Sequence, residues 1–145
     1  MDSWKEFDTG VVTHSVSHYL AAIADLTEEH GYARVVDIAR HLNITRGSVS
    51  LGLKPLKKRG LVLADRNRHL MLSDEGMRIV EQIRTRRRIL TAFFEDVLGV
   101  NAEQADMDAC KIEHLLSDEV CRRLDRFTDK YGRQEAGARR SANPS

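Results

Sequence analysis

The residues best suited to chemistry are a cysteine, a glutamate and a histidine near position 110. Cys110, Glu113 and His114 are spaced i, i+3 and i+4, so on a helix they share one face. A thiolate, a carboxylate and an imidazole that converge there suit a borderline divalent cation such as Fe²⁺, Mn²⁺ or Zn²⁺. A buried cysteine beside a hydrogen-bonded histidine can have the same spacing. The cluster alone therefore does not distinguish a metal site from a purely structural group of side chains.

Two further imidazoles, His14 and His18, are four residues apart near the start of the chain. The apolar stripe of this segment runs through Val16, Ile23 and Leu26, and His18 lies off that stripe. His18 is therefore available as a fourth ligand. We interpret His14 as an exposed residue near a frayed helix start.

The charged residues are segregated along the chain, although the 145 residues carry a formal net charge of only +1. Residues 43–70 hold seven basic residues and one acidic residue, whereas residues 1–30 and 101–131 are net acidic. Such segregation favours separate tasks, with a polyanion as partner for the basic segment. A solvated charged face would have the same composition. The order of the predicted helices and strands is therefore needed to decide whether the basic segment binds a polyanion.

Helical spacing of apolar residues predicts three helices in the first half of the chain, over about 16–30, 36–42 and 46–58. Thr45 is a suitable N-cap for the third. Gly52 weakens that third helix by about 1 kcal/mol, since glycine is a poor helix former. A tight turn separates the second helix from the third, as in a helix-turn-helix.

Two short β-prone runs follow, over 61–64 and 69–72, and they flank the charged tip 65–68. This pattern predicts a β-hairpin. Three helices followed by a hairpin is the order of a winged helix-turn-helix, so we predict that residues 1–73 form such a domain and bind double-stranded operator DNA.

In a winged helix-turn-helix the second helix of the motif presents its N-terminal residues to the major groove. Hydroxyl groups and an arginine there can donate to phosphates or base edges, and a leucine can contact a thymine methyl group. Lysines further along the helix and arginines at the wing tip are expected to face phosphates. The residues predicted to contact DNA are Thr45, Arg46, Ser48, Ser50, Leu51, Lys54, Lys57, Arg66 and Arg68.

The second half of the chain is predicted to be all helical, so the fold class is mainly α. A helix from 74 to about 98 is long enough to indicate a role in dimerisation. Further helices are expected over 102–115 and 118–131. These make a helical dimerisation domain over 74–131, followed by a tail, 132–145, that we expect to be disordered.

The sequence also bears on the compartment of the protein. No apolar run approaches the roughly 18 residues of a membrane-spanning helix, and residues 1–6 lack the basic and apolar regions of a signal peptide. Two cysteines, Cys110 and Cys121, cannot form a disulfide framework, and we expect them to be independent thiols. These features favour a cytoplasmic protein.

Residues 108–124, DACKIEHLLSDEVCRRL, resemble the metal-binding helix of the diphtheria toxin repressor and manganese transport regulator family. Residues 31–39 and 60–62 resemble the DNA-binding domain of that family, and the similarity covers about 16–131. The resemblance implies a metal-activated, homodimeric repressor, without the SH3-like third domain for which this chain is too short. It also places the activating metal site on His18, Cys110, Glu113 and His114.

The same resemblance bears on the identity and number of the metal ions. Iron-responsive members have a cysteine at the position of Cys110, whereas His18 matches neither the iron nor the manganese branch. This donor set is softer than Mn²⁺ prefers, so we expect one Fe²⁺ per protomer, with Mn²⁺ as the alternative and Zn²⁺ or Co²⁺ able to bind in vitro. A second metal position of the family would fall on Arg87, Thr91 and Asp106, and we expect no ion there because arginine cannot ligate a cation.

The resemblance implies that a metal held by His18 and the three later ligands fixes the spacing of the two recognition helices in the dimer. Three alternatives stay open: a manganese or zinc sensor of the same fold, a constitutive DNA-binding protein with a merely buried Cys110, and a metal-dependent hydrolase. A hydrolase is disfavoured because no separate general base or oxyanion donor is apparent. We therefore expect that the protein is not an enzyme.

Overall fold

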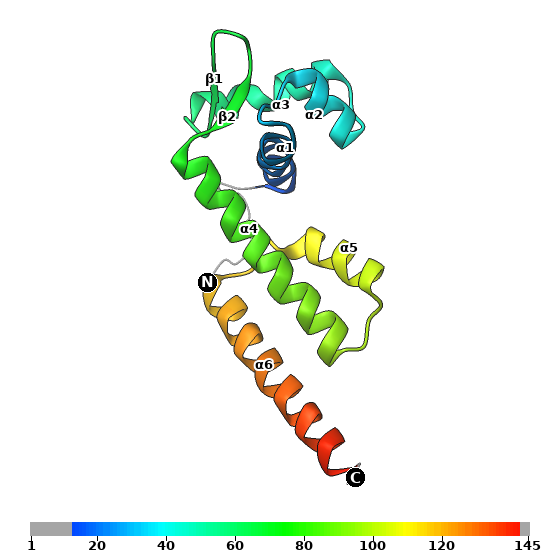
Figure 1. Cartoon of the computed structure of the whole chain (residues 1–145). Coiled ribbons are helices and arrows are strands. Elements are labelled where there is room, and N and C mark those ends of the chain that lie inside the picture. Colours follow the sequence, from blue (N-terminus) through cyan, green and yellow to red (C-terminus); the bar gives the residue numbers. More distant parts are fainter. Residues whose placement is uncertain (1–12, 143–145) are drawn as a thin grey trace. The chain divides into compact units, whose positions relative to one another are not determined.

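The computed structural model describes residues 13–142, so the segment 1–6, on which the absence of a signal peptide was inferred, lies outside the described residues. The chain divides into two compact units, one up to Ile83 and one from Arg84 onward, and the boundary falls inside helix α4 (Figure 1). Among the described residues, none of the helices is both long and apolar enough to span a membrane.

The first unit contains the three predicted helices, α1 (His14–His30), α2 (Val35–Leu42) and α3 (Arg46–Lys58). Helix α1 begins after Thr13, whose Oγ1 accepts a hydrogen bond from the amide of Val16, 3.3 Å away. It ends at Gly31, whose φ of 81° suits glycine. The apolar faces of the helices form one core, which includes Leu20, Ile23, Ile38, Val49, Leu53, Leu56 and Leu61.

The predicted hairpin consists of β1 (Val62–Ala64) and β2 (Leu70–Leu72), paired antiparallel. Leu70 is buried in the core, and its amide donates to the carbonyl of Ala33 at 2.7 Å. This bond joins the hairpin to the loop between α1 and α2, so the wing is anchored to the helices that it accompanies.

The second unit is all helical, as predicted. It contains the C-terminal part of α4 (Asp74–Ala92), then the π-helical turn η2 (Phe93–Val97), α5 (Ala102–Ile112) and α6 (Asp118–Ser141). Helix α6 packs on η2, and the rings of Phe93 and Phe127 lie 6.3 Å apart.

Three predicted boundaries in this half differ from the structure. The helix expected to continue to about 98 becomes π-helical after Ala92, and the helix expected to continue to 115 ends at Ile112. The segment 132–145, expected to be a disordered tail, is helical as far as Ser141, and residues 143–145 lie outside the described residues. Helix-forming residues such as Arg133 and Gln134 extend α6 even though each glycine in it costs about 1 kcal/mol.

Candidate DNA interface and metal ligands

Helix α3 separates a buried apolar face from an exposed polar face. Val49, Leu53 and Leu56 are in the core, and Leu51 is 67% exposed. All nine residues that were predicted to contact DNA are exposed: Thr45, Arg46, Ser48, Ser50, Leu51, Lys54, Lys57, Arg66 and Arg68. The polar face of α3 is therefore free to enter a groove of DNA.

The start of α3 is fixed by its own side chains. Thr45 Oγ1 accepts a hydrogen bond from the amide of Ser48 at 3.1 Å, and the two hydroxyl oxygens lie 2.9 Å apart. Thr45 is therefore the N-cap, as predicted. The hydroxyls of Thr45 and Ser48 hold the first turn of α3 in addition to any contact that they make with DNA.

Tyr19 packs across α3 at the position of Gly52. Its hydroxyl donates to the carbonyl of Ser48 at 3.3 Å. A β-carbon on Gly52 would lie only 2.4 Å from Cε2 of the Tyr19 ring. Gly52, which lowers the helix propensity of α3, therefore makes room for Tyr19, which follows the candidate metal ligand His18 in α1.

A cavity of about 530 Å³ lies between the wing tip and the start of α3. Three arginines line it: Arg46 from α3, Arg68 from the wing and Arg34, which precedes α2. The guanidinium of Arg34 also lies over the ring of Tyr32, 5.0 Å from its centroid. A cavity lined by three cations suits a DNA phosphate.

Sequence reasoning missed Arg34 because the basic segment was taken to begin after it. Its position immediately before the first helix of the helix-turn-helix motif is the signal that could have identified it, since that helix crosses the DNA backbone.

The wing tip is organised around Asp65. Its Oδ1 accepts hydrogen bonds from the amides of Asn67 and His69, each at 2.8 Å. The hydrogen bond from the amide of His69 is the largest cause that holds the pKa of Asp65 below its usual range. Burial opposes it, and the hydrogen bond from Asn67 adds to the lowering. A carboxylate at position 65 therefore presents Arg66 and Arg68 in a defined turn.

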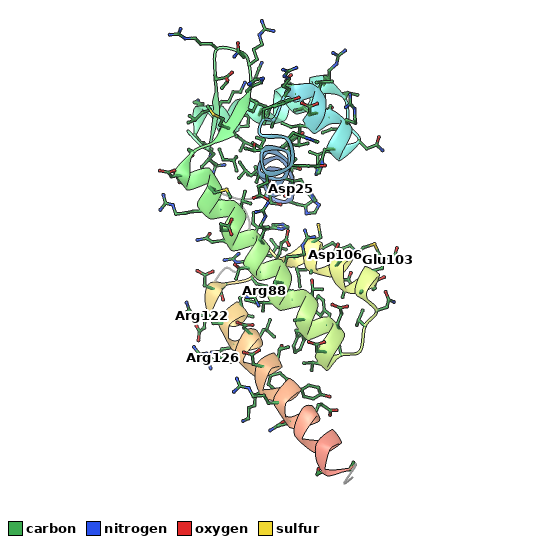
Figure 2. The ribbon with its side chains drawn as sticks, viewed as in Figure 1. Asp25, Arg88, Glu103, Asp106, Arg122 and Arg126 are labelled. Carbon is green, nitrogen blue, oxygen red and sulfur yellow. The ribbon has the colours of Figure 1, made fainter. Side chains whose placement is uncertain are left out.

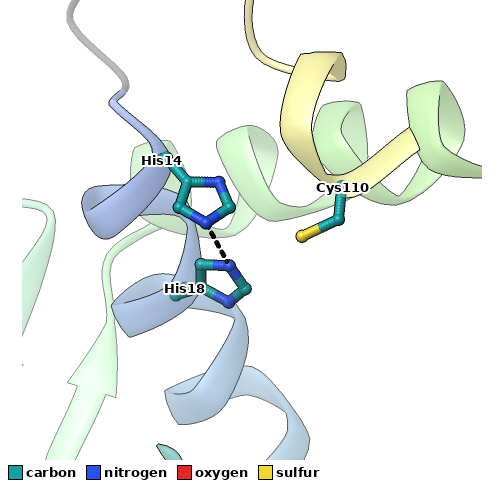
Figure 3. A group of neighbouring side chains, drawn as sticks. All are labelled: His14, His18 and Cys110. Atoms are coloured by element: carbon teal, nitrogen blue, oxygen red, sulfur yellow. Dashed lines mark hydrogen bonds between the residues drawn. The ribbon is translucent and has the colours of Figure 1, made fainter. Parts of the chain in front are cut away.

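His18 is in the first unit, and Figure 3 shows its ring beside that of His14. The Nε2 atoms of the two rings are 3.0 Å apart, and the ring planes are nearly perpendicular, at 79°. His14 is thus part of the capped first turn of α1, rather than part of a frayed end.

The other three predicted ligands are in the second unit, at the end of α5. Cys110 is within the helix, and Glu113, its C-cap with helical dihedrals, begins a turn that continues through His114. Cys110 and His114 are half-buried, and Glu113 is 2% exposed. Cys110 is thus on the helix, whereas Glu113 and His114 lie in the turn at its end.

The carboxylate of Glu113 is occupied by Arg87 from α4. Nε of Arg87 donates to Oε2 of Glu113, and Nη2 donates to Oε1 at 3.0 Å. The third nitrogen, Nη1, donates to Asp106 on α5 at 3.1 Å, and Figure 2 labels Asp106. Hydrogen bonding to Glu113 is the largest cause of a pKa of Arg87 raised above its ordinary value.

Arg86, the neighbour of Arg87, binds the same turn from its backbone side. Its Nη1 donates to the carbonyl of Glu113 at 3.2 Å, and its Nη2 donates to Asp118 at 2.7 Å. Two consecutive arginines of α4 therefore hold the turn between α5 and α6, one at a side chain and one at a carbonyl.

Neither Cys110 nor Cys121 forms a disulfide, as expected for independent residues. Burial raises the pKa of the Cys110 thiol, and the charge of Arg87 opposes this rise. Burial also raises the pKa of Cys121. Cys110 is therefore a protonated thiol at neutral pH.

A winged helix-turn-helix with an exposed basic helix, joined to a helical unit that carries sulfur, oxygen and nitrogen donors, defines a metal-responsive DNA-binding regulator as the class of protein. Family comparison agrees. The model of the iron-dependent repressor N-terminal DNA-binding domain matches residues 12–70, and that of the iron-dependent repressor metal-binding and dimerisation domain matches residues 73–140. The chain belongs to the iron-dependent repressor family, a family of metal-dependent transcriptional repressors and not of enzymes.

Individual relatives are consistent with this family. The chain is 36% identical over 117 residues to the transcriptional regulator MntR of Escherichia coli O6:H1, covering 81% of this chain and 75% of that protein. It is 36% identical over 105 residues to the HTH-type transcriptional regulator MntR of Geobacillus thermodenitrificans, covering 72% of this chain and 74% of that protein.

Solved structures show the same fold. The IdeR structure from T. acidophilum has a TM-score of 0.65 at 28% identity, covering 77% of this chain and 53% of that chain. The structure of the manganese regulator SloR has a TM-score of 0.72 at 26% identity, covering 81% of this chain and 55% of that chain. The chain thus spans about half the length of these two solved proteins.

Proposed function

We propose that this protein is an Fe²⁺-activated repressor that binds double-stranded operator DNA as a homodimer in the cytoplasm. The exposed polar and basic face of α3, set against a fully buried apolar face, is the observation that carries DNA binding. The match to a dimerisation domain supports the homodimer.

For the activating ion we propose the ligands His18, Cys110, Glu113 and His114. The chemistry of these donors fits a borderline divalent cation, since two imidazoles, a thiolate and a carboxylate are all ligands of Fe²⁺ and Zn²⁺. Glu113 fits on one condition: its carboxylate has to exchange Arg87 for the metal. A bound cation supplies a fixed positive centre, and Cys110 has to lose its proton to hold it.

Because His18 belongs to the DNA-binding unit and the other three ligands to the second unit, shared ligation would favour the arrangement that binds DNA. Metal and operator would then each increase the affinity for the other, as linkage requires. We expect the metal-free protein to bind operator weakly.

The identity of the metal is proposed from the donors. Cys110 and the imidazoles make the set softer than Mn²⁺ prefers, which favours Fe²⁺. Mn²⁺ is the alternative, because one structural relative is named a manganese regulator. Zn²⁺ and Co²⁺ are expected to bind in vitro through the same donors.

The test is an anaerobic mobility-shift titration of operator DNA with metal-free protein and with protein loaded with Fe²⁺, Mn²⁺, Zn²⁺ or Co²⁺. We expect Fe²⁺ to increase affinity at least tenfold, and His18→Ala to abolish that increase. His30→Ala, which changes an exposed histidine at the other end of α1, is the matched control. Equal affinity of metal-free and loaded protein would instead indicate a constitutive DNA-binding protein.

A further inference from the structure

The first unit contains a second imidazole at the position of the proposed ligand His18. We infer that His14 is a metal ligand together with His18, both through Nε2. This inference rests on the proposed function, and it adds a donor that the family resemblance does not provide. It is argued from α1 and its surroundings alone.

The separation of the two rings is suited to a cation. Two metal–nitrogen bonds of about 2.0–2.1 Å place their nitrogens about 3 Å apart at an octahedral right angle and about 3.4 Å apart at the tetrahedral angle that Zn²⁺ favours. The Nε2 atoms of His14 and His18 are 3.0 Å apart, so both can bind one ion with little movement. Histidines spaced i and i+4 on one helix face are a known zinc-chelating arrangement.

The backbone holds His14 in position before any ion arrives. Thr13 caps the helix, and the hydroxyl of Ser17 donates to the carbonyl of His14 at 2.7 Å. Ser17 is itself buried, at 3% exposed. Both imidazoles therefore project from a regular helical turn, so chelation requires no ordering of the backbone.

The pair also has room for an ion and its remaining ligands. His14 and His18 line a surface cavity of about 420 Å³, together with Tyr19, Leu42 and Ile44. A third histidine of this cavity, His41, lies 3.8 Å from a carboxylate oxygen of Asp25. His41 is not grouped closely with the other two rings, so the inference concerns the two histidines of α1.

In the metal-free protein one Nε2 carries the proton of the hydrogen bond between the rings. An ion bound by both rings requires that proton to be on Nδ1, so the tautomer of one ring changes. This change provides a readout that does not depend on DNA binding.

The experiment uses the full chain under anaerobic conditions, with Zn²⁺ as a diamagnetic probe and Fe²⁺ as the proposed ion. His14→Ala is expected to lower the affinity for both ions at least tenfold, as is His18→Ala, whereas His30→Ala leaves it unchanged. In ¹⁵N spectra of the histidine rings, Zn²⁺ is expected to shift Nε2 of both His14 and His18 in the unmodified protein.

The inference is overturned if His14→Ala binds Zn²⁺ and Fe²⁺ as the unmodified protein does and the His14 ring does not respond to Zn²⁺. If the variant fails to fold, the ring spectra of the unmodified protein decide alone. If both rings bind the ion but metal does not change the affinity for operator DNA, this inference is supported and the proposed function is refuted. If the protein binds no metal, both are refuted.

Discussion

Arg87 gives the second unit a half-buried positive charge that neutralises the buried carboxylate of Glu113, a proposed metal ligand. The side chain of Glu113 is 2% exposed and that of Arg87 is 31% exposed. Removal of one partner of such a pair leaves an uncompensated buried charge, which costs about 3 kcal/mol or somewhat less here, because water reaches Arg87. We therefore expect Arg87→Gln to destabilise the metal-free protein by about 2–3 kcal/mol in chemical denaturation.

The same variant tests whether Glu113 is a ligand. If it is, a divalent cation can replace the lost guanidinium, so Fe²⁺ should stabilise Arg87→Gln more than it stabilises the unmodified protein. Arg87→Lys keeps the charge and is the control. Equal stabilisation of all three proteins by Fe²⁺ would show that Glu113 stays outside the metal site.

Asp65 leads to a pH prediction for the wing. Its pKa is lowered in the folded protein, so its stabilising effect is present above its ordinary pKa and is lost as the pH falls through the lower folded value. The amide proton shifts of Asn67 and His69, which donate to Asp65, should titrate together with a midpoint below about 3.9. Asp65→Ala should abolish this titration and increase hydrogen exchange at both amides.

The control for the wing is Asp37→Ala, because Asp37 lies in α2 and outside the hairpin. It should leave both titrating amides unchanged. A common midpoint at or above the ordinary value for aspartate would contradict the role that we assign to Asp65.

Substitution of two glycines of α3 distinguishes the effect of helix propensity on stability from the effect of packing. Gly47→Ala should stabilise the protein by up to about 1 kcal/mol, because alanine favours helix and its β-carbon would have only Thr45 Oγ1 nearby, at 3.9 Å. Gly52→Ala gives the same gain in helix propensity, but the added β-carbon would clash with the ring of Tyr19. Overpacking of this kind costs about 1–3 kcal/mol, so the packing effect should prevail.

Chemical denaturation of the two alanine variants measures this difference directly. In the double variant Tyr19→Ala/Gly52→Ala the clash is absent, so the cost of Gly52→Ala should be smaller than in the presence of Tyr19. An equal cost in both backgrounds would show that Tyr19 is not the cause.

How well each element could be predicted depends on how local its determinants are. Helix α3 was predicted to the residue because its cap, Thr45, and its buried face belong to one short segment. The π-helical turn over Phe93–Val97 was missed because apolar spacing does not distinguish a π turn from the α-helix before it. The length of α6 was underestimated because its glycines were weighed above its helix-forming residues.

The candidate site shows the same limit. Cys110, Glu113 and His114 were found because they are close in sequence, and Arg87 was recognised only as a residue that cannot ligate. Its hydrogen bonds to Glu113 join residues 26 positions apart, which no local pattern reveals. The sequence alone predicts a frayed start at His14, because the cap that orders this turn depends on the amide of Val16 donating a hydrogen bond to Oγ1 of Thr13.

For the molecule as a whole, the net charge is close to zero, although one surface is expected to face DNA. We expect the affinity of that surface for DNA to depend on few cations. With 23 basic and 22 acidic residues, general attraction to DNA is weak, so individual phosphate contacts should be measurable. Arg34, Arg46 and Arg68 line one cavity of the first unit. If each holds a phosphate, a homodimer loses two contacts when Arg34 is replaced.

Arg34→Ala should therefore weaken operator binding by the metal-loaded protein and make the plot of log K against log salt less steep by about 2, since each phosphate contact contributes about 0.9 to the slope. Binding has to be measured at several salt concentrations with the same operator. Arg123→Ala, which removes a cation of α6 that pairs with Glu119, is the matched control and should leave the slope unchanged. A slope unchanged by Arg34→Ala would place Arg34 outside the DNA interface, and its guanidinium would then serve the contact with Tyr32. A reduced slope would extend the interface from α3 and the wing to the residue before α2, a position that the basic segment of the sequence does not include.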